Sequence, residues 1–192
     1  MINKKERLDN LKNSIIQKNL TPDLSKQAIN LVFGSGLIDS EIMIIGEAPG
    51  AKEDKMGEPF VGASGKVLDQ LLEGINLNRE DVYITNIVKY RPPKNRDPSK
   101  EEKAIFWPIL LEQIKIIKPR IIVPLGRHSA GQFLPEIVIS QHHGQIFKYK
   151  IDNEEFQVLP LYHPAATIYN RKLRPELEAD FQKIAQILAQ KS

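Results

Sequence analysis

The sequence has no cysteine among its 192 residues. This absence excludes disulfide bonds, thiolate zinc sites, a cysteine nucleophile and cysteine-ligated iron–sulfur clusters. Long hydrophobic runs are also lacking, since no apolar stretch approaches the roughly 18 residues that cross a bilayer. The polar N-terminal segment contains no apolar core of a signal peptide. We therefore expect a cytoplasmic protein that does not associate with membranes.

The excess of positive over negative charge is small as well, because the sequence has 27 Lys and Arg residues and 24 Asp and Glu residues, for a net charge of +3. This mild basic balance permits a polyanionic partner such as nucleic acid without requiring one. The hydrophobic fraction of 41% and the charged fraction of 27% are typical of a globular protein. Because the chain has no repeats and no long linker, we predict a single α/β domain over residues 1–192.

Strand-like and helical patterns alternate along the chain. Strands are predicted at 42–45, 81–88 and 121–125. Helices are predicted at 5–18, from about 64, from 99 to about 118, and at 175–190. The segment 137–159 adds two short strand-like runs around Gly144, with a turn at Asp152 and Asn153. The alternation of strands and helices predicts a parallel sheet covered by helices.

The strand at 42–45 runs directly into Gly-Glu-Ala-Pro-Gly at 46–50. Its four apolar residues predict a strand that is buried on both faces. Open α/β sheets place their ligand sites in the loops at the carboxyl ends of the strands, and Glu47 would lie in such a loop. Glycine and proline also mark ordinary turns, so this segment alone leaves both interpretations open.

Several motifs, taken in order, resemble the uracil-DNA glycosylase superfamily. They are Gly46-Glu47-Ala48-Pro49-Gly50 with Glu53-Asp54, Glu58-Pro59-Phe60-Val61-Gly62, residues 83–96, residues 121–126, and His163-Pro164-Ala165-Ala166. The resemblance is closest to family 4, the thermostable iron–sulfur type, and it runs from about Leu31 to the C-terminal helix, with 1–30 loosely matched. It implies a three-layer α/β/α fold with a four-stranded parallel sheet. It also implies a monofunctional hydrolase that cleaves the N-glycosidic bond of deoxyuridine in DNA and leaves an abasic site.

The resemblance assigns catalytic roles to two residues. His163 would hydrogen-bond the uracil O2 and stabilise the leaving anion, although an isolated His-Pro pair is more typical of a turn. Glu47 would activate a water molecule or support the developing sugar cation, and the sequence leaves both roles open. We expect Glu53 and Asp54 to form a solvated acidic loop.

Substrate binding is implied for four further residues. Asn86 would bind the uracil edge, because an amide is both donor and acceptor; the alternative is a polar residue that simply ends a strand. Phe60 would stack on the flipped base. Without the resemblance, a phenylalanine at this position would be assigned to the hydrophobic core. The backbone N–H groups of Ala48 and Gly50 would help to hold the base or the water.

A basic loop follows the second strand and suits contacts with DNA phosphates. Its cationic side chains are Lys89, Arg91, Lys94 and Arg96. A solvated loop without a partner is the alternative. Family members carry a leucine shortly after the His-Pro motif that fills the gap left by the flipped base. In this sequence Ile168 or Tyr169 would serve.

The run Gln141-His142-His143-Gly144 departs from the family pattern, which has an arginine before the glycine. Neighbouring residues of a strand point to opposite faces, so we do not expect the two histidines to share a metal ion. We predict instead that one of them, His143, faces the DNA in place of the arginine.

A second departure concerns the cofactor. Family 4 enzymes hold a 4Fe–4S cluster on four cysteines, of which the third would fall at Tyr90, the fourth near Phe106, and the first two around Asn19 and Pro22. None of these residues is cysteine. We therefore expect no cofactor and no metal, and we predict that packing of Tyr90 against Phe106 replaces the cluster.

Taken together, the motifs predict a monomeric glycosylase that acts on uracil-containing DNA in base excision repair. Two alternatives stay open: a glycosylase for another deaminated base such as hypoxanthine, and a catalytically silent DNA- or nucleotide-binding protein of the same fold. Loss of the cysteines favours the silent protein. The joint presence of Glu47, Asn86 and His163 favours the enzyme.

Overall fold

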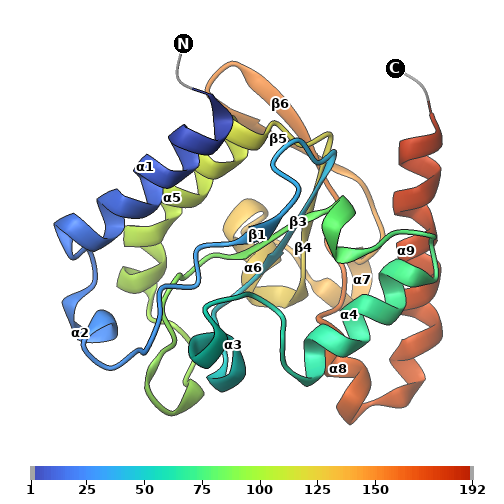
Figure 1. The fold of residues 1–192 in the computed structure, drawn as a ribbon. Coiled ribbons are helices and arrows are strands. Elements are labelled where there is room, and N and C mark those ends of the chain that lie inside the picture. The colour runs from blue at the N-terminus through green and yellow to red at the C-terminus, as the bar shows by residue number, and fades with distance from the viewer. Residues whose placement is uncertain (1–2, 191–192) are drawn as a thin grey trace.

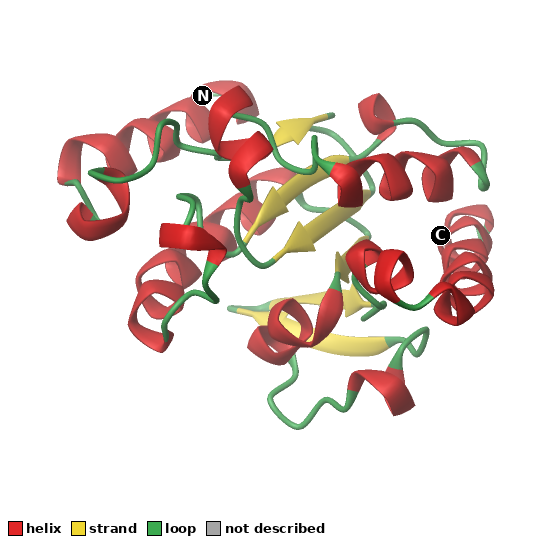
Figure 2. Ribbon diagram, turned by 90° about the horizontal axis from the view of Figure 1, so that it is seen from below, coloured by secondary structure: helices red, strands yellow, loops and turns green. Residues whose placement is uncertain are grey.

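The computed structural model describes residues 3–190, which form a six-stranded sheet with helices on both faces (Figures 1 and 2). The strand order is β1-β3-β2-β4-β6-β5. The strands are β1 (Ser35–Gly36), β2 (Ile42–Gly46), β3 (Tyr83–Asn86), β4 (Ile121–Pro124), β5 (Phe147–Ile151) and β6 (Glu154–Val158). Of these, β3, β2, β4 and β6 are parallel, and β1 and β5 pair antiparallel at the two edges.

The three-layer α/β/α fold is thus confirmed, but the predicted count of four strands was too low. The four parallel strands are present, and the two edge strands are additional. β1 has only two residues, too few for an alternating pattern to be visible in the sequence. β5 and β6 form a hairpin whose tight turn contains Asp152 in the left-handed region, at φ 53°.

The helices divide between the two faces of the sheet. They are α1 (Lys4–Lys18), α2 (Pro22–Ser25), α3 (Ala51–Met56), α4 (Ala63–Glu73), α5 (Lys100–Ile117), α6 (Gly126–Phe133), α7 (Ile139–His142), α8 (Pro164–Tyr169) and α9 (Arg174–Ala189). α1 and α5 cover one face, and α4 and α9 cover the other (Figure 1). No helix within residues 3–190 is long and apolar enough to cross a membrane.

Strand β2 links the two hydrophobic cores. Met43 and Ile45 pack into the core under α1 and α5, whereas Ile42 and Ile44 pack into the core under α4 and α9. Every residue of β2 is buried, which confirms the strand predicted to be covered on both faces. Alternate side chains of a strand point to opposite faces, so four successive apolar residues serve two cores.

The predicted helices at α1, α4, α5 and α9 are confirmed, and the four short helices α2, α3, α7 and α8 were missed. α3 occupies part of the predicted loop after β2; it begins after Gly50 and ends at Gly57, which adopts φ 75°. α7 replaces the first of the two strand-like runs around Gly144. Helices of four to six residues are too short to show a helical period in the sequence.

The parallel strands bring their loops to one end of the molecule. Gly46 of β2 lies beside Asn86 of β3, and Leu125 after β4 bridges to Leu161 after β6. The segments carrying Glu47, Asn86, His128 and His163 therefore leave the sheet at the same edge, where α3 and α8 also lie (Figure 1).

Candidate active site

Two adjoining hollows lie at the carboxyl edge of the sheet. The inner pocket has a volume of about 180 Å³ and is lined by Ala48, Gly50, Glu53, Phe60, Ser64, Asn86 and His163. The outer groove, of about 390 Å³, lies between Glu47, the 92–98 loop, the start of α6 and α8. Ala48, Gly50 and His163 line both, so the hollows are continuous. The structure thus brings together all the residues predicted to bind the substrate or to take part in catalysis.

Phe60 is held in the inner pocket by an unusual backbone conformation. It adopts φ 54°, a left-handed value that is strained for a bulky residue. Arg79 donates to Phe60 O at 2.8 Å and to Pro59 O at 2.7 Å, and its guanidinium also pairs with Asp69 at 2.9 Å. The Phe60 ring stacks on His163, with centroids 5.6 Å apart and an interplanar angle of 27°. The backbone of Phe60 is therefore held by Arg79 from outside the pocket, and its ring is held by His163 within it.

Glu53 and Asp54 do not form a solvated loop, so that prediction was wrong. Glu53 lies in the inner pocket, where its Oε1 accepts from Gly62 N at 2.7 Å. Asp54 is 2% exposed and accepts from Ile29 N and Asn30 N at 2.8 and 3.1 Å. Both carboxylates bind backbone N–H groups of distant segments, which a local sequence pattern cannot reveal.

His163 caps the start of α8, and its side chain lines both hollows. Its Nδ1 accepts from Ala165 N at 3.1 Å. Burial lowers the pKa of His163 to about 4, although the Glu53 carboxylate acts in the opposite direction. The imidazole is therefore neutral near pH 7, and because Nδ1 is an acceptor its proton lies on Nε2. His163 can donate one hydrogen bond into the pocket without carrying charge.

Asn86 ends β3 and is 2% exposed. Its carbonyl accepts from Lys89 Nζ at 2.6 Å, which fixes the backbone that carries the amide. A Cβ added at Gly46 would lie 2.3 Å from Asn86 Oδ1 and 2.7 Å from the Phe60 ring. Glycine at position 46 therefore leaves the space that the side chains of Asn86 and Phe60 occupy.

This crowding makes Gly46→Ala a test of the pocket. We expect the methyl group to displace Asn86 and Phe60 and to lower the rate of the reaction at this site by about 100-fold, the effect of misplaced binding groups. Steady-state activity and the melting temperature would be measured together. The matched control is Gly131→Ala in α6, where a methyl meets no atom of residues 3–190 within 4 Å. Equal activity in the two variants would contradict the prediction.

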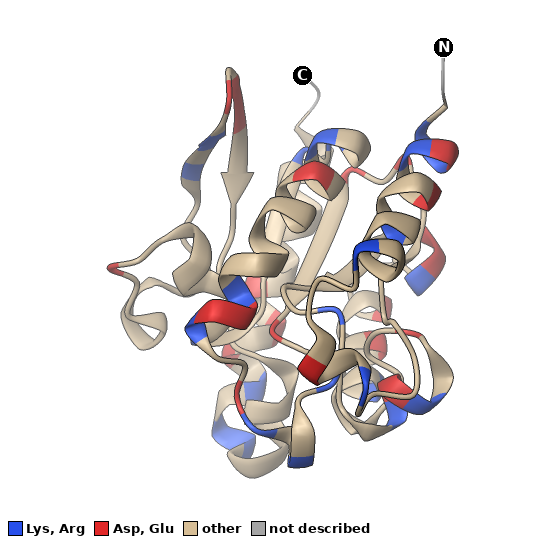
Figure 3. Ribbon diagram, turned by 90° about the vertical axis from the view of Figure 1, so that its left-hand side faces the viewer, with Lys and Arg blue, Asp and Glu red and all other residues tan. Residues whose placement is uncertain are grey.

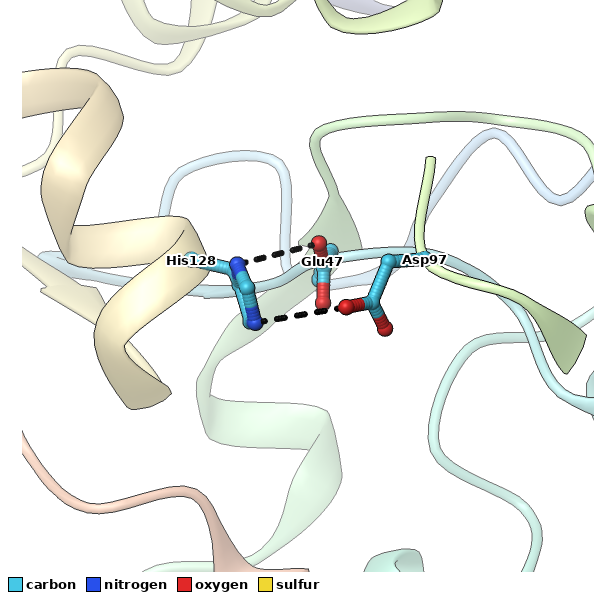
Figure 4. A group of neighbouring side chains, drawn as sticks. All are labelled: Glu47, Asp97 and His128. Atoms are coloured by element: carbon cyan, nitrogen blue, oxygen red, sulfur yellow. Dashed lines mark ion pairs between the residues drawn. The ribbon is translucent and has the colours of Figure 1, made fainter. Parts of the chain in front are cut away.

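Glu47 lies in the outer groove within a network of charges (Figure 4). Lys103 Nζ and His128 Nδ1 each lie 3.6 Å from Glu47 Oε1, and His128 Nε2 lies 3.6 Å from Asp97 Oδ2. Burial raises the pKa of Glu47, against the opposing effects of His128 and Lys103. The carboxylate can accept a proton or support a cation in the groove.

The ligand atoms of Glu47, Asp97 and His128 lie within 4.8 Å of one another, which is also the spacing of many metal sites. Two cationic side chains adjoin the same group, because Lys103 pairs with Glu47 and Arg127 Nε donates to His128 Nε2 at 3.1 Å. These cations would repel a divalent ion. We interpret the group as an ion-pair network.

Comparison with known proteins decides the family. Residues 33–189 match the family model described as the uracil DNA glycosylase superfamily. The chain belongs to this superfamily. A type-4 uracil-DNA glycosylase of Archaeoglobus fulgidus is 45% identical over 175 residues, covering 88% of this chain and 87% of the relative. One of Sulfurisphaera tokodaii is 48% identical over 82% of this chain and 74% of its own length, and one of Thermotoga maritima is 37% identical over 93% and 94%. The protein is therefore a DNA glycosylase, a hydrolase.

One residue of the glycosylase assigned to DNA contact lies in the interior instead. Lys89 is fully buried, and its Nζ donates to Thr85 Oγ1, Asn86 O and Gln113 Oε1 at 2.7, 2.6 and 2.5 Å. Burial lowers its pKa well below the ordinary value. Lys89 cannot reach a phosphate, so its predicted DNA contact was wrong. Its role is to hold the end of β3 behind the pocket.

The remaining basic side chains of the loop face solvent. Arg91 Nε donates to Asn95 Oδ1 at 2.7 Å, and Arg96 binds both carboxylate oxygens of Glu102 at 2.8 and 2.6 Å. The Glu102 pair neutralises part of the Arg96 charge. Figure 3 shows charged positions of both signs at this end of the glycosylase rather than one uniform basic patch.

His142 and His143 do not lie in a strand, so the predicted strand geometry was wrong. His142 ends α7, and its Nδ1 accepts from Val138 N. His143 is half-buried, with Nδ1 2.5 Å from Asp180 Oδ2 and its ring 4.4 Å from that of Tyr162. Asp180 comes 37 residues later, so the sequence around the histidines carried no signal of this pairing.

The positions at which the family resemblance implied cluster cysteines contain packed side chains in this glycosylase. Tyr90 and Phe106 meet edge to face, with centroids 6.2 Å apart and an interplanar angle of 62°. Phe106 is fully buried and Tyr90 is 8% exposed. Asn19 caps the end of α1, and Pro22 begins α2. These residues offer no thiolate and do not fit an iron–sulfur cluster.

Proposed function

We propose that this glycosylase removes uracil from DNA and leaves an abasic site, the opening step of base excision repair. The observation that carries the proposal is the inner pocket, where an aromatic face, a buried amide and a neutral imidazole donor surround a space of about 180 Å³. A flat base with two carbonyl oxygens and a ring N–H between them matches these groups.

In the proposed reaction the nucleotide is flipped out of the duplex and its base enters the inner pocket. Uracil stacks on Phe60, and the Asn86 amide accepts from N3–H and donates to O4. As the glycosidic bond breaks, negative charge develops on the base, and the Nε2–H of His163 stabilises it at O2. Backbone N–H groups at Ala48 and Gly50 support the base or the water.

Glu47 acts on the sugar side of the bond in this proposal. The outer groove adjoins the pocket, so its carboxylate can accept a proton from the attacking water or stabilise the cationic sugar. Both roles require the ionised form. Glu53, which lines the pocket and holds Gly62, is an additional support of the base site.

We propose that DNA contacts come from exposed side chains around these hollows. Arg91 and Arg96 suit backbone phosphates. Ile168 is 45% exposed and Tyr169 90% exposed at the end of α8, so either can enter the stack in place of the flipped base. His143 stays a predicted DNA contact, in an environment already occupied by Asp180. A monomeric state and a cytoplasmic location also stay predictions.

We propose further that the protein functions without a cofactor and that the Tyr90–Phe106 pair does the structural work of a cluster. We expect Phe106→Ala to lower the free energy of unfolding by about 3–5 kcal/mol, because it opens a cavity in the core. Urea unfolding would measure it. The control is Ile105→Ala on the same helix, where the side chain is 41% exposed and the loss should stay near 1 kcal/mol or below. Similar losses in both would argue against the packing role.

The proposed function is tested by measuring abasic sites on a labelled oligonucleotide with one uracil, single-stranded and opposite G or A. Oligonucleotides with hypoxanthine or normal bases run alongside. The double variant Asn86→Ala/His163→Ala guards against contaminating activity. Uracil release that the double variant lacks supports the proposal. Release of hypoxanthine alone favours another deaminated base, and DNA binding without release favours the silent protein.

A further inference from the structure

The charge of Glu47 depends on neighbours that the reaction described above does not use. The carboxylate is half-buried, and its Oε1 has no hydrogen-bond partner among residues 3–190. A carboxylate removed from water takes up a proton more readily, and burial is the largest influence on Glu47, raising its pKa. DNA lying over the outer groove would remove more water. The ionised form therefore needs nearby positive charge.

Charged groups face Glu47 from each surrounding element. Lys103 comes from α5 and His128 from the first turn of α6, each 3.6 Å away. Asp97, from the loop before α5, opposes them by raising the Glu47 pKa. Arg96, Arg127 and His163 line the same groove. Lys103 and His128 are the two partners whose nitrogen atoms lie within 4 Å of the carboxylate among residues 3–190.

His128 is oriented for this contact by its second nitrogen. Its Nδ1 faces Glu47, whereas its Nε2 faces Asp97 (Figure 4). The same Nε2 accepts the Arg127 Nε–H at 3.1 Å. The ring therefore spans two carboxylates, one in the groove and one in the loop that carries Arg91 and Arg96. Through His128, the loop predicted to contact phosphates is joined to the group that acts at the sugar.

We propose that His128, together with Lys103, is a positioning residue that keeps Glu47 ionised and directed into the groove while DNA is bound. The inference rests on the proposed function of Glu47. Because His128 Nε2 accepts the Arg127 Nε–H, the ring proton lies on Nδ1, the nitrogen 3.6 Å from Glu47 Oε1, and this N–H dipole favours the ionised carboxylate. Removing either partner raises the Glu47 pKa, and the loss of activity at low pH then begins at a higher pH.

The test is a pH profile of single-turnover uracil excision for wild type, His128→Gln and Lys103→Met. We expect the acid limb to move upward by about one pH unit in Lys103→Met, since an opposite charge at this distance shifts a carboxyl pKa by about that amount or more, and upward by a smaller amount in His128→Gln, which loses the Nδ1–H dipole. At pH values on the acidic side of the limb, a shift of one pH unit corresponds to an about tenfold lower rate. Protonation of His163 does not set this limb if its pKa stays near 4.

Two matched controls carry the same substitutions elsewhere. For Lys100→Met, the residue is exposed on α5, one turn from Lys103. For His142→Gln, the residue lies on α7 outside both hollows. Their acid limbs should coincide with that of wild type. A rate loss in His128→Gln that is uniform across pH, or a limb equally shifted in the controls, would overturn the role of His128. The same results for Lys103→Met would overturn the role of Lys103.

A second measurement separates this inference from the proposed function. Carbon-13 NMR of the labelled Glu47 carboxyl, in the free protein, reports its titration without any reaction. We expect its midpoint to rise in His128→Gln and in Lys103→Met. If wild type releases no uracil, the proposed function fails, and the NMR titration still decides whether Lys103 and His128 hold Glu47 ionised. An unchanged midpoint in both variants would overturn the inference.

Discussion

His163→Ala is expected to lower the rate of uracil excision by about 10²–10³-fold, the effect of removing one donor from a developing anion. The variant loses the Nε2–H that faces the inner pocket. It also loses the acceptor for Ala165 N at the start of α8. Single-turnover kinetics on a uracil oligonucleotide would measure the rate, and the melting temperature would report on the fold.

A second substitution separates the two effects of His163. His163→Asn keeps an acceptor suited to the start of a helix and should restore stability without restoring the rate fully. The control His142→Ala removes a histidine outside both hollows. Because burial lowers the pKa of His163 to about 4, its imidazole is neutral throughout pH 6–8, and the ratio of wild-type to His163→Ala rates should stay constant over that range. A ratio that changes steeply would contradict a neutral donor.

Asn86→Ala should have a larger effect, about 10³-fold or more on kcat/KM for uracil. Two hydrogen bonds to the base are lost at once, and a buried base edge left without partners is strongly disfavoured. Asn86→Asp has nearly the same shape but lacks the N–H donor and adds negative charge beside the developing anion, so it should also be severely impaired. The exposed Asn10→Ala on α1 is the control. Activity within about tenfold of wild type in Asn86→Ala would argue that the amide does not bind the base.

The parts of the fold that could be predicted are those set by local patterns. Residues 42–46 carry an uninterrupted apolar run, which limited them to a strand buried on both faces. A helix was predicted from residue 99, and the Ser99 side chain caps its start by accepting from Glu102 N at 3.1 Å. The positions of Asn86 and His163 followed once the strands were known to be parallel, because parallel strands end at one edge.

The errors concern residues whose environment is made by distant segments. Lys89 sits in a basic, proline-rich run that resembles a solvated loop, and its burial depends on Gln113, 24 residues later on α5. Glu53 is held in the pocket by its hydrogen bond from Gly62 N, and His143 is held in place by its contact with Asp180. Charged residues are usually exposed unless they are paired, and a single sequence does not indicate which distant group supplies the pair.

The strained backbone at Phe60 has a consequence for how damage is found. A Cβ at Gly65 would lie 1.7 Å from Phe60 O, and Arg79 holds the same carbonyl, so this segment has its final shape before DNA arrives. A preorganised surface loses little conformational entropy on binding. The selective step then shifts to the duplex, where unpairing a base takes a few kcal/mol, and less when it is mispaired. A rigid pocket of this kind captures bases that the DNA duplex itself releases. Under the proposed function, weakly paired uracil is the base captured most often.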